Sequence, residues 1–141
     1  MSRIYWDTML FAYFLEANPQ FGPRVRLIHQ EMMRRGDALC TSIFTVGEML
    51  TGPHKTKTFV KVKETREFFE SDEVELIPFT INTAEIYAKI RAENSILPAD
   101  AIHLASAAES RTDLFLTNDR KLQGLNIPGI KFITGLDGKL I

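Results

Sequence analysis

Apolar and polar residues follow two patterns along the chain, and together they predict an ordered series of strands and helices. Short apolar runs bounded by turn residues are typical of buried strands, and longer segments with apolar residues three or four positions apart are typical of helices. The predicted strands cover residues 3–6, 38–41, 74–78, 114–117 and 130–134. The predicted helices cover residues 9–18, 24–35, 43–52, 56–70, 80–94, 98–110 and 119–124.

Residues that favour helix ends support several of these boundaries. Pro23 precedes the second predicted helix, and Gly36 follows it, in the order that helix starts and stops favour. Ser42 is a good N-cap for the third helix. Gly52-Pro53 is expected to end that helix, because proline cannot donate a backbone hydrogen bond inside it.

The order of the elements predicts the fold class. Strands that alternate with helices indicate an α/β protein with a central parallel sheet of about five strands and helices on both faces. No repeat, low-complexity segment or linker interrupts the chain, so residues 1–141 are expected to form a single domain. In such sheets ligands bind beyond the carboxyl ends of the strands, and the residues that follow each strand are therefore the informative ones.

Composition narrows the class of protein further. The chain has 141 residues, 45% of them hydrophobic, which suits one domain with its own core. No segment reaches the ~18 apolar residues of a membrane-spanning helix. Asp7 interrupts the apolar N-terminal run, and no signal-peptide cleavage site follows it. Cys40 is the single cysteine, which excludes an intrachain disulfide, and we expect a cytoplasmic protein with no membrane partner.

Acidic residues stand at the expected carboxyl edge of the sheet, each among hydrophobic neighbours. Asp7 follows the first strand in YWDTML, and Asp119 follows the fourth in FLTND. Glu48 lies within the third helix in TVGEML, and Asp100 in the first turn of a later helix in LPADAI. Acids rarely accept apolar surroundings unless they are paired or bind a cation.

Each acid also has an ordinary structural explanation. Asp7 and Asp119 are well placed to cap the helices that follow them, and Asp100 complements a helix dipole. Glu48 has a possible surface partner in Lys55. Four carboxylates in one crevice would nevertheless repel each other, and hard oxygen ligands of this kind suit Mg²⁺ or Mn²⁺.

The order of these motifs resembles that of PIN-domain nucleases. The residues that carry the resemblance are Asp7 in WDT, Glu48 in VGEML, Asp100 opening DAIHLASAA, and Thr117-Asn118-Asp119 in FLTND. The length and single-domain layout are most similar to the VapC-type toxin ribonucleases of toxin–antitoxin pairs. One departure is Met9, which stands where the family often has a small polar residue.

The resemblance implies a function and a set of site residues. It implies an endoribonuclease that depends on Mg²⁺ or Mn²⁺, with Asp7, Glu48, Asp100 and Asp119 as catalytic residues and metal ligands. It also implies an RNA substrate, a cognate antitoxin and a homodimer. The antitoxin's apolar residues are expected near Phe11, Phe14 or Phe21, although these phenylalanines suit the core or a homodimer interface equally well.

Several further residues are candidates for substrate binding or for support of the site. Thr8 suits either a capping role or the site itself, and Thr117 and Asn118 suit either the loop or a phosphate contact. The candidate cations for the RNA backbone are Arg120, Lys121, and Lys55 and Lys57 with the rest of the basic stretch 54–66, each of which also suits a solvated surface. His103 is expected to be a hydrogen-bonded structural histidine.

The net charge of −1 argues against nucleic-acid binding through bulk basicity. Setting the four candidate carboxylates aside leaves +3, so a mildly basic surface around an acidic pocket remains compatible with RNA. No histidine cluster has zinc-ligand spacing, and the glycines form no phosphate-binding loop.

Three competing functions remain. A catalytically silent PIN-like binding domain would have lost one or more of the acids, and none is missing. A ribonuclease of RNA processing would act without an antitoxin. A phospho-receiver would carry an acceptor aspartate after the third strand, where this chain has Pro78-Phe79-Thr80.

Overall fold

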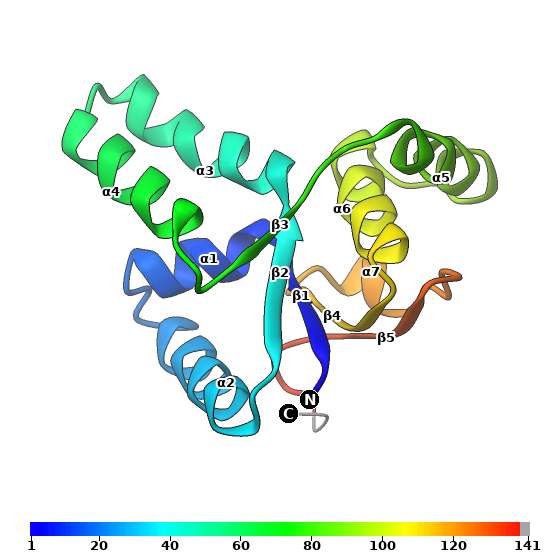
Figure 1. Cartoon of the computed structure of the whole chain (residues 1–141), viewed down its shortest axis with the longest axis horizontal. Helices are drawn as coiled ribbons and strands as arrows, with labels where there is room; N and C mark the ends of the chain where they lie inside the picture. The colour runs from blue at the N-terminus through cyan, green and yellow to red at the C-terminus, as the bar shows by residue number, and fades with distance from the viewer. Residues whose placement is uncertain (139–141) are drawn as a thin grey trace.

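A computed structural model of the protein describes residues 1–138 and contains one parallel five-stranded sheet (Figure 1). The strands lie in the order β3-β2-β1-β4-β5. Their bounds are β1 Arg3–Trp6, β2 Ala38–Ser42, β3 Glu75–Ile77, β4 Thr112–Leu116 and β5 Ile130–Thr134. The predicted α/β fold with a central parallel sheet is confirmed, and the strand order shows that β1 lies in the middle of the sheet.

Helices cover both faces of the sheet, as Figure 1 shows. One face carries α1 and α2, with α3 and α4 beyond them, and the other carries α5, α6 and α7. The helix bounds are α1 Thr8–Leu15, α2 Gly22–Arg35, α3 Ile43–Lys55, α4 Phe59–Glu70, α5 Ile81–Glu93, α6 Pro98–Glu109 and α7 Arg120–Gln123.

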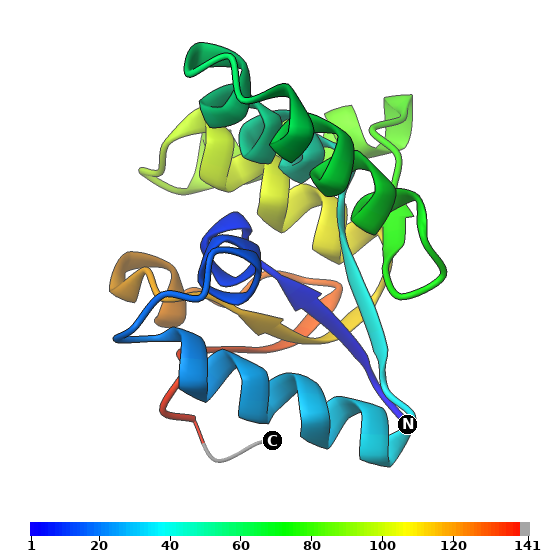
Figure 2. The ribbon, with the colours of Figure 1, turned by 90° about the vertical axis from the view of Figure 1, so that its left-hand side faces the viewer.

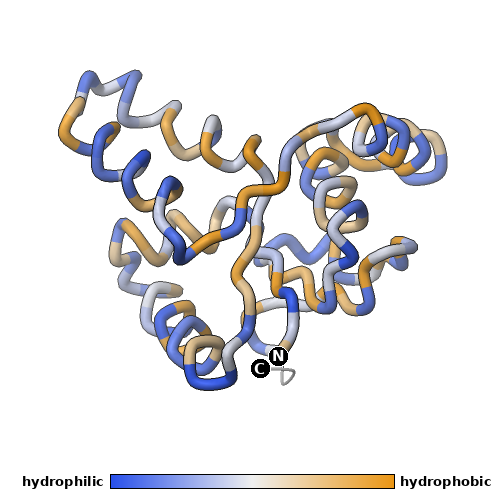
Figure 3. The backbone as a smooth tube through the Cα atoms, in the orientation of Figure 1, coloured by the Kyte–Doolittle hydropathy of each residue, from blue (hydrophilic) through white to orange (hydrophobic). Residues whose placement is uncertain are grey.

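Two hydrophobic clusters, one on each face of the sheet, form the core. Neighbouring residues of β1 divide between them, because successive side chains of a strand point to opposite faces. Ile4 and Trp6 belong to the cluster with α1 and α2, and Tyr5 belongs to the cluster with α6. The hydropathy colouring in Figure 3 shows hydrophobic stretches along the strands and mixed character along the helices, as a sheet buried on both faces requires.

Small residues allow α6 to pack closely on the sheet. Its alanines at 101, 105 and 107 are fully buried, as the alanine-rich sequence predicts. Gly129, with a φ of 99°, approaches the end of this helix, and a Cβ at that position would lie 2.6 Å from the carbonyl oxygen of Ala108. A residue with a side chain could not approach Ala108 so closely, and the contact therefore requires glycine at position 129.

Two predicted helix ends differ from those in the structure. The third helix continues past Pro53 to Lys55, because Gly52 has no Cβ to clash with the proline ring. The first helix ends at Leu15 rather than at residue 18. The side chain of Asn18 instead accepts hydrogen bonds from the backbone N–H groups of Gln20 and Phe21, and these bonds shape the turn into α2.

The carboxyl ends of β1 and β4 lie at the same edge of the sheet (Figure 2), where α1 and α7 begin. Trp6 pairs with Leu116 at the ends of these strands. Asp7 and Thr117, the next residues along the chain, therefore lie side by side. Of the helices in residues 1–138, none is long and apolar enough to cross a membrane.

Candidate active site

Asp7 is held at the junction between β1 and α1 by hydrogen bonds to both of its carboxylate oxygens. Oδ1 accepts the backbone N–H of Thr8 at 2.8 Å, which makes Asp7 the N-cap of α1. Oδ2 accepts the hydroxyl of Thr117 at 2.7 Å. The backbone N–H of Asp7 donates to the carbonyl of Leu116, which ties the acid to the end of β4.

Thr117 also positions Asp119. The Thr117 hydroxyl is fully buried and accepts the backbone N–H of Asp119 at 3.0 Å while it donates to Asp7. Asp119 Oδ1 accepts the backbone N–H of Lys121 at 2.9 Å and so caps α7. The capping roles expected for Asp7 and Asp119 are thus real, and they leave both acids at one pocket. Of the two roles suggested for Thr117, the structure supports the fixing of the loop.

Glu48 reaches the same pocket from α3. Its Oε1 accepts the Thr8 hydroxyl at 2.6 Å and lies 2.7 Å from His103 Nε2. Its partners are therefore Thr8 and His103, and not Lys55. Burial alone would raise the pKa of Glu48, but the hydrogen bonds from His103 and Thr8 outweigh burial and lower this pKa below its usual value.

His103 is 2% exposed and orients Glu48. Its Nδ1 lies 2.7 Å from the Tyr5 hydroxyl, whose oxygen accepts the backbone N–H of Ser42 at 3.1 Å. Burial raises the pKa of Tyr5 far above its usual value, so the phenol keeps its proton and donates it to Nδ1. With Nδ1 accepting from Tyr5, Nε2 is the nitrogen that donates to Glu48. The expected hydrogen-bonded histidine is confirmed, and Tyr5 is a supporting residue that the sequence analysis missed.

Asp100 faces the other acids from the first turn of α6. Burial raises the pKa of its carboxyl group, and the negative charges of Asp119 and Asp7 raise it further. Among residues 1–138 no donor is hydrogen-bonded to this carboxylate. The negative charge of Asp100 therefore has no hydrogen-bonded partner among these residues, and a bound cation would compensate it.

The four acids share one pocket of about 310 Å³. Thr8 and Asn118 also line it, and Asn118 Nδ2 donates to the Tyr13 hydroxyl at 3.2 Å. Tyr13 had no signal in the sequence beyond its place in an apolar helix. The complete lining is Asp7, Thr8, Met9, Tyr13, Glu48, Ala99, Asp100, His103, Asn118 and Asp119.

The donor atoms of this pocket suit a hard divalent cation, since carboxylate oxygens are the ligands that Mg²⁺ and Mn²⁺ prefer. Burial is the main cause of the raised pKa of Asp100, and the negative charges of Asp119 and Asp7 add to it; a bound cation would offset both effects. Within residues 1–138, however, no three His, Cys, Asp or Glu side chains stand close enough together to hold an ion. Oxygens of Asp7 and Glu48 are engaged by protein donors instead. The metal ligands remain a prediction.

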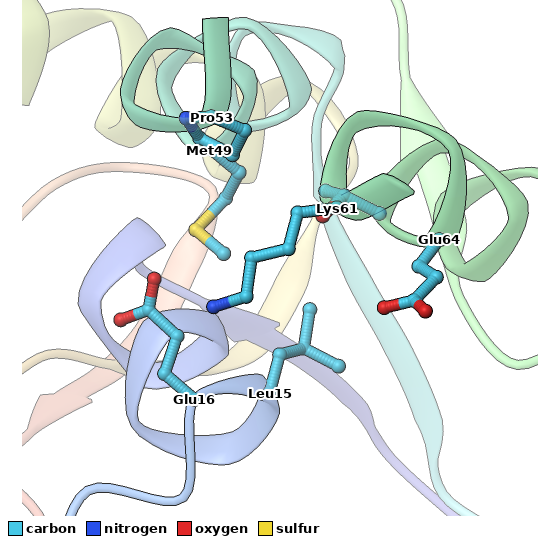
Figure 4. Close-up of a pocket in the computed structure, with 7 residues that line it drawn as sticks. Leu15, Glu16, Met49, Pro53, Lys61 and Glu64 are labelled. Carbon is cyan, nitrogen blue, oxygen red and sulfur yellow. The ribbon is translucent and has the colours of Figure 1, made fainter. Parts of the chain in front are cut away.

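The predicted cations separate into two groups. Arg120 and Lys121 line pockets that adjoin the acids. Lys55 and Lys57 do not line the acidic pocket and lie at the exposed end of α3. Lys61 of the same basic stretch extends across a separate pocket toward Glu16, as Figure 4 shows. That pocket lies between α1, α3 and α4 and is lined by Leu15, Glu16, Met49, Pro53, Lys61, Glu64 and Thr65.

The parallel sheet with acids at its carboxyl edge defines an α/β protein with a candidate cation-binding site, and a sequence comparison identifies the family. The PIN domain family matches residues 4–127, which is most of the chain. The chain therefore belongs to the PIN domain family, as its motifs indicate. No curated protein matches the sequence.

Solved structures with a similar fold include chains of toxin–antitoxin complexes. VapBC2 from Rickettsia felis, bound to a DNA fragment from its promoter, matches with a TM-score of 0.70 and 16% identity over 94% of this chain and 98% of that chain. DNA-bound VapBC from Salmonella typhimurium matches with a TM-score of 0.69 and 23% identity over 96% and 99%. A toxin–antitoxin complex from Klebsiella pneumoniae matches with a TM-score of 0.65 and 21% identity over 90% and 94%. At these identities the likeness concerns the fold.

Proposed function

We propose that this protein is a divalent-metal-dependent endoribonuclease and the toxin of a toxin–antitoxin pair. The observation that carries the proposal is the meeting of Asp7, Glu48, Asp100 and Asp119 at one pocket of a PIN domain. These acids come from four separate parts of the sequence. The lining of this pocket contains these four carboxylates and no Lys or Arg. Such a site suits Mg²⁺ or Mn²⁺, whose positive charge would balance the carboxylates.

Asp7 and Asp100 are the proposed central ligands, and Asp119 is a ligand of a second or weaker site. A divalent cation held there would supply positive charge to the scissile phosphate and would lower the pKa of the attacking water. Glu48, fixed by His103 and Thr8, orients that water. Thr117 keeps Asp7 and the loop of Asp119 in register. Arg120 and Lys121 bind the RNA backbone beside the acids.

The nuclease proposal is tested with single-stranded RNA in Mg²⁺ or Mn²⁺. Cleavage should stop when EDTA is added, and Asp100→Asn should lower the rate by at least about 100-fold, the scale expected when a group that stabilises the transition state is lost. Asp72→Asn, at an exposed turn outside the pocket, is the matched control and should cleave normally. Full activity of folded Asp100→Asn protein, or activity that survives EDTA, would reject the proposed site.

The proposed antitoxin needs an apolar docking surface on this chain. Phe11 is fully buried in the core and is not available, whereas Phe14 and Phe21 are partly buried beside it. The pocket of Figure 4 combines Leu15, Met49 and Pro53 with charged side chains at the junction of α1, α3 and α4. Nearby on α4, Phe59 is 62% exposed and Val60 is 70% exposed. We therefore assign the antitoxin to this surface rather than to Phe11.

The partner is tested by co-expression of the chain with its genomic neighbour. We expect a stable complex with suppressed RNA cleavage, and restored cleavage once the neighbour is proteolysed. Phe59→Ser and Val60→Ser should weaken the complex while cleavage by the free protein is retained. A neighbour that neither binds nor inhibits would remove the toxin assignment and favour a ribonuclease of RNA processing. Light scattering of the free protein tests the proposed homodimer.

A further inference from the structure

We propose that a polar pocket beside the acids is a subsite that reads one nucleobase of single-stranded RNA by its edge. This inference rests on the proposed function and deepens it, because it states which side chains select the sequence that is cut. The polar pocket measures about 570 Å³. Its lining is Gln20, Phe21, Asn118, Arg120, Gln123, Thr134, Gly135, Leu136, Asp137 and Gly138.

The polar pocket adjoins the acids through a shared residue. Asn118 lines both pockets. Asp100 likewise lines both the acidic pocket and a third pocket of about 420 Å³, whose lining is Asn94, Ser95, Ile96, Leu97, Asp100, Lys121, Leu122 and Leu125. The acidic pocket therefore adjoins two others. A strand whose scissile phosphate sits at the acids has space for a nucleotide on each side.

Three consecutive residues, the N-cap of α7 and its first two residues, each line a different one of these three pockets. Asp119 lines the acidic pocket, Arg120 the polar pocket, and Lys121 the third pocket. Each flanking pocket thus has one cation for a backbone phosphate, next to the acid that lies between them.

The chemistry of the polar pocket suits a base rather than a second phosphate. Gln20, Asn118 and Gln123 offer amide donors and acceptors, which pair with base edges. Asp137 accepts hydrogen bonds from exocyclic amino groups and would repel a phosphate. Arg120 is the only Lys or Arg among its lining residues. A pocket built for phosphate would carry more cations and no acid.

Two aromatic side chains are in contact where the acidic pocket and the polar pocket adjoin. Tyr13 lines the acidic pocket and Phe21 lines the polar pocket, with their ring centroids 4.8 Å apart. Tyr13 is buried and Phe21 is partly buried, so Phe21 is the ring on which a base splayed out of a single strand would stack. Stacking holds any base, whereas the amide groups at its edge distinguish one base from another.

The walls of the polar pocket are held in place before RNA binds. Arg24 Nε donates to the carbonyl of Leu136 at 2.7 Å and ties the segment after β5 to α2. Gln123 Nε2 donates to the carbonyl of Thr117 at 3.4 Å, and a Cβ at Gly135 would lie 2.8 Å from the same nitrogen. A rigid wall is what discrimination between bases requires.

The third pocket provides a contrast within the same molecule. Four of its lining residues are aliphatic: Ile96, Leu97, Leu122 and Leu125. Aliphatic side chains contact a base without reading its edge, and Lys121 binds phosphate as a point charge. We therefore expect sequence preference on the side of the polar pocket and little preference on the side of the third pocket.

The test uses RNA binding, so that it does not depend on cleavage. A random single-stranded RNA pool is bound to Asp100→Asn protein, and the bound sequences are determined. We expect a preference of about tenfold at one position, the scale of one good base contact. Gln20→Met and Gln123→Met, each added to Asp100→Asn, should reduce that preference to about twofold or less. Gln30→Met, at an exposed position of α2 outside these pockets, is the matched control.

The outcomes separate the two proposals. Lys121→Gln should weaken all sequences alike and leave the preference unchanged. A preference that survives both Gln20→Met and Gln123→Met, or a pool bound without preference or not bound at all, would overturn the base-reading subsite even if the unmodified protein cleaves RNA. A preference that is lost in these variants would support the subsite even if the unmodified protein cleaves no RNA, and the nuclease proposal alone would then fail.

Discussion

At the scale of single residues, helix capping and candidate chemistry use the same side chains. Oδ1 of Asp119 accepts the backbone N–H of Lys121 and so caps α7, and this bond fixes the direction of the carboxylate. Asp7 is fixed in the same way by Thr8 and Thr117. A cap holds a charged group rigidly at the end of a strand, and the ordinary explanation of each acid therefore supports the functional one.

Asp100→Asn should stabilise the protein without metal at neutral pH. Burial and the charges of Asp119 and Asp7 raise the pKa of Asp100 in the folded state. The folded protein then holds this proton more tightly than the unfolded chain, so stability falls as pH rises through the folded pKa. Removing the charge should raise Tm in EDTA at pH 7 by a few degrees. Below the unfolded pKa, where both states are protonated, the gain should disappear in thermal melts. An equal gain at every pH would show that charge is not its cause.

Tyr5→Phe tests the network behind Glu48. The substitution keeps the ring and leaves Ser42 N–H and His103 Nδ1 without the hydroxyl that bonds them both. Unsatisfied buried groups cost about 1–3 kcal/mol, and denaturant unfolding should report a loss of this size. Cleavage should fall by less than in Asp100→Asn, because Glu48 keeps its bond from Thr8. Tyr87→Phe, whose hydroxyl bonds Arg91 at the surface, is the control, and equal losses in both variants would contradict the network.

At the scale of elements, α3 connects the acids to the basic stretch. Glu48 and Lys55 lie on this helix, about 10 Å apart along its axis by the usual helical rise. On α4, Lys63 lies 3.9 Å from Glu67 and Arg66 lies 3.5 Å from Glu70. These two cations are partly neutralised by their own helix. Lys55 and Lys57 have no such ion-pair partner within residues 1–138. They are therefore better candidates to bind phosphate than Lys63 and Arg66 of the same basic stretch.

Lys55→Gln with Lys57→Gln should weaken RNA binding and flatten its salt dependence. Each lost phosphate contact should reduce the slope of log K against log salt by about 0.7 for a single strand. Binding titrations at several salt concentrations measure this slope. Lys63→Gln with Arg66→Gln removes the same charge and should change the slope less. Equal slopes for both pairs and the unmodified protein would leave the α3–α4 corner as an ordinary solvated surface.

At the scale of the whole molecule, the site exists only in the folded chain. Its acids lie after β1, on α3, on α6 and after β4, and the parallel sheet brings these segments to one edge. In the unfolded chain the same carboxylates are far apart. A cation that binds them together therefore binds the native state, and its binding energy adds to folding stability.

Mn²⁺ should raise the melting temperature of this protein in proportion to the logarithm of its concentration once the site is saturated. At about 100 times Kd the added stability is about 2.7 kcal/mol. The shift should vanish in the Asp7→Asn, Asp100→Asn double variant and persist in Asp72→Asn. Scanning calorimetry across a Mn²⁺ series measures it. The same shift in the double variant would place the ions elsewhere.

The sequence by itself determined the element types, the parallel sheet and the candidate acids. These features depend on local signals: apolar runs of strand length, Pro23 and Gly36 at the ends of α2, and Ser42 capping α3. A polar residue at most a few positions past the end of a buried strand lies near the carboxyl edge of a parallel sheet, and Asp7 follows β1 directly while Asp119 lies three residues after Leu116 of β4. Asp7 and Asp119 were therefore predictable in position without any knowledge of contacts.

The tertiary structure alone decided what each of these residues touches. Tyr5 and His103 are 98 residues apart, and only the packing of α6 against β1 makes the first a partner of the second. The extent of α3 beyond Pro53 and the burial of Phe11 were likewise settled by packing rather than by propensity. The pockets beside the acids are formed by residues from the turn before α2, the α5–α6 connection and the segment after β5. Hydrogen bonds and pockets depend on distances between remote segments, and a linear pattern does not contain those distances.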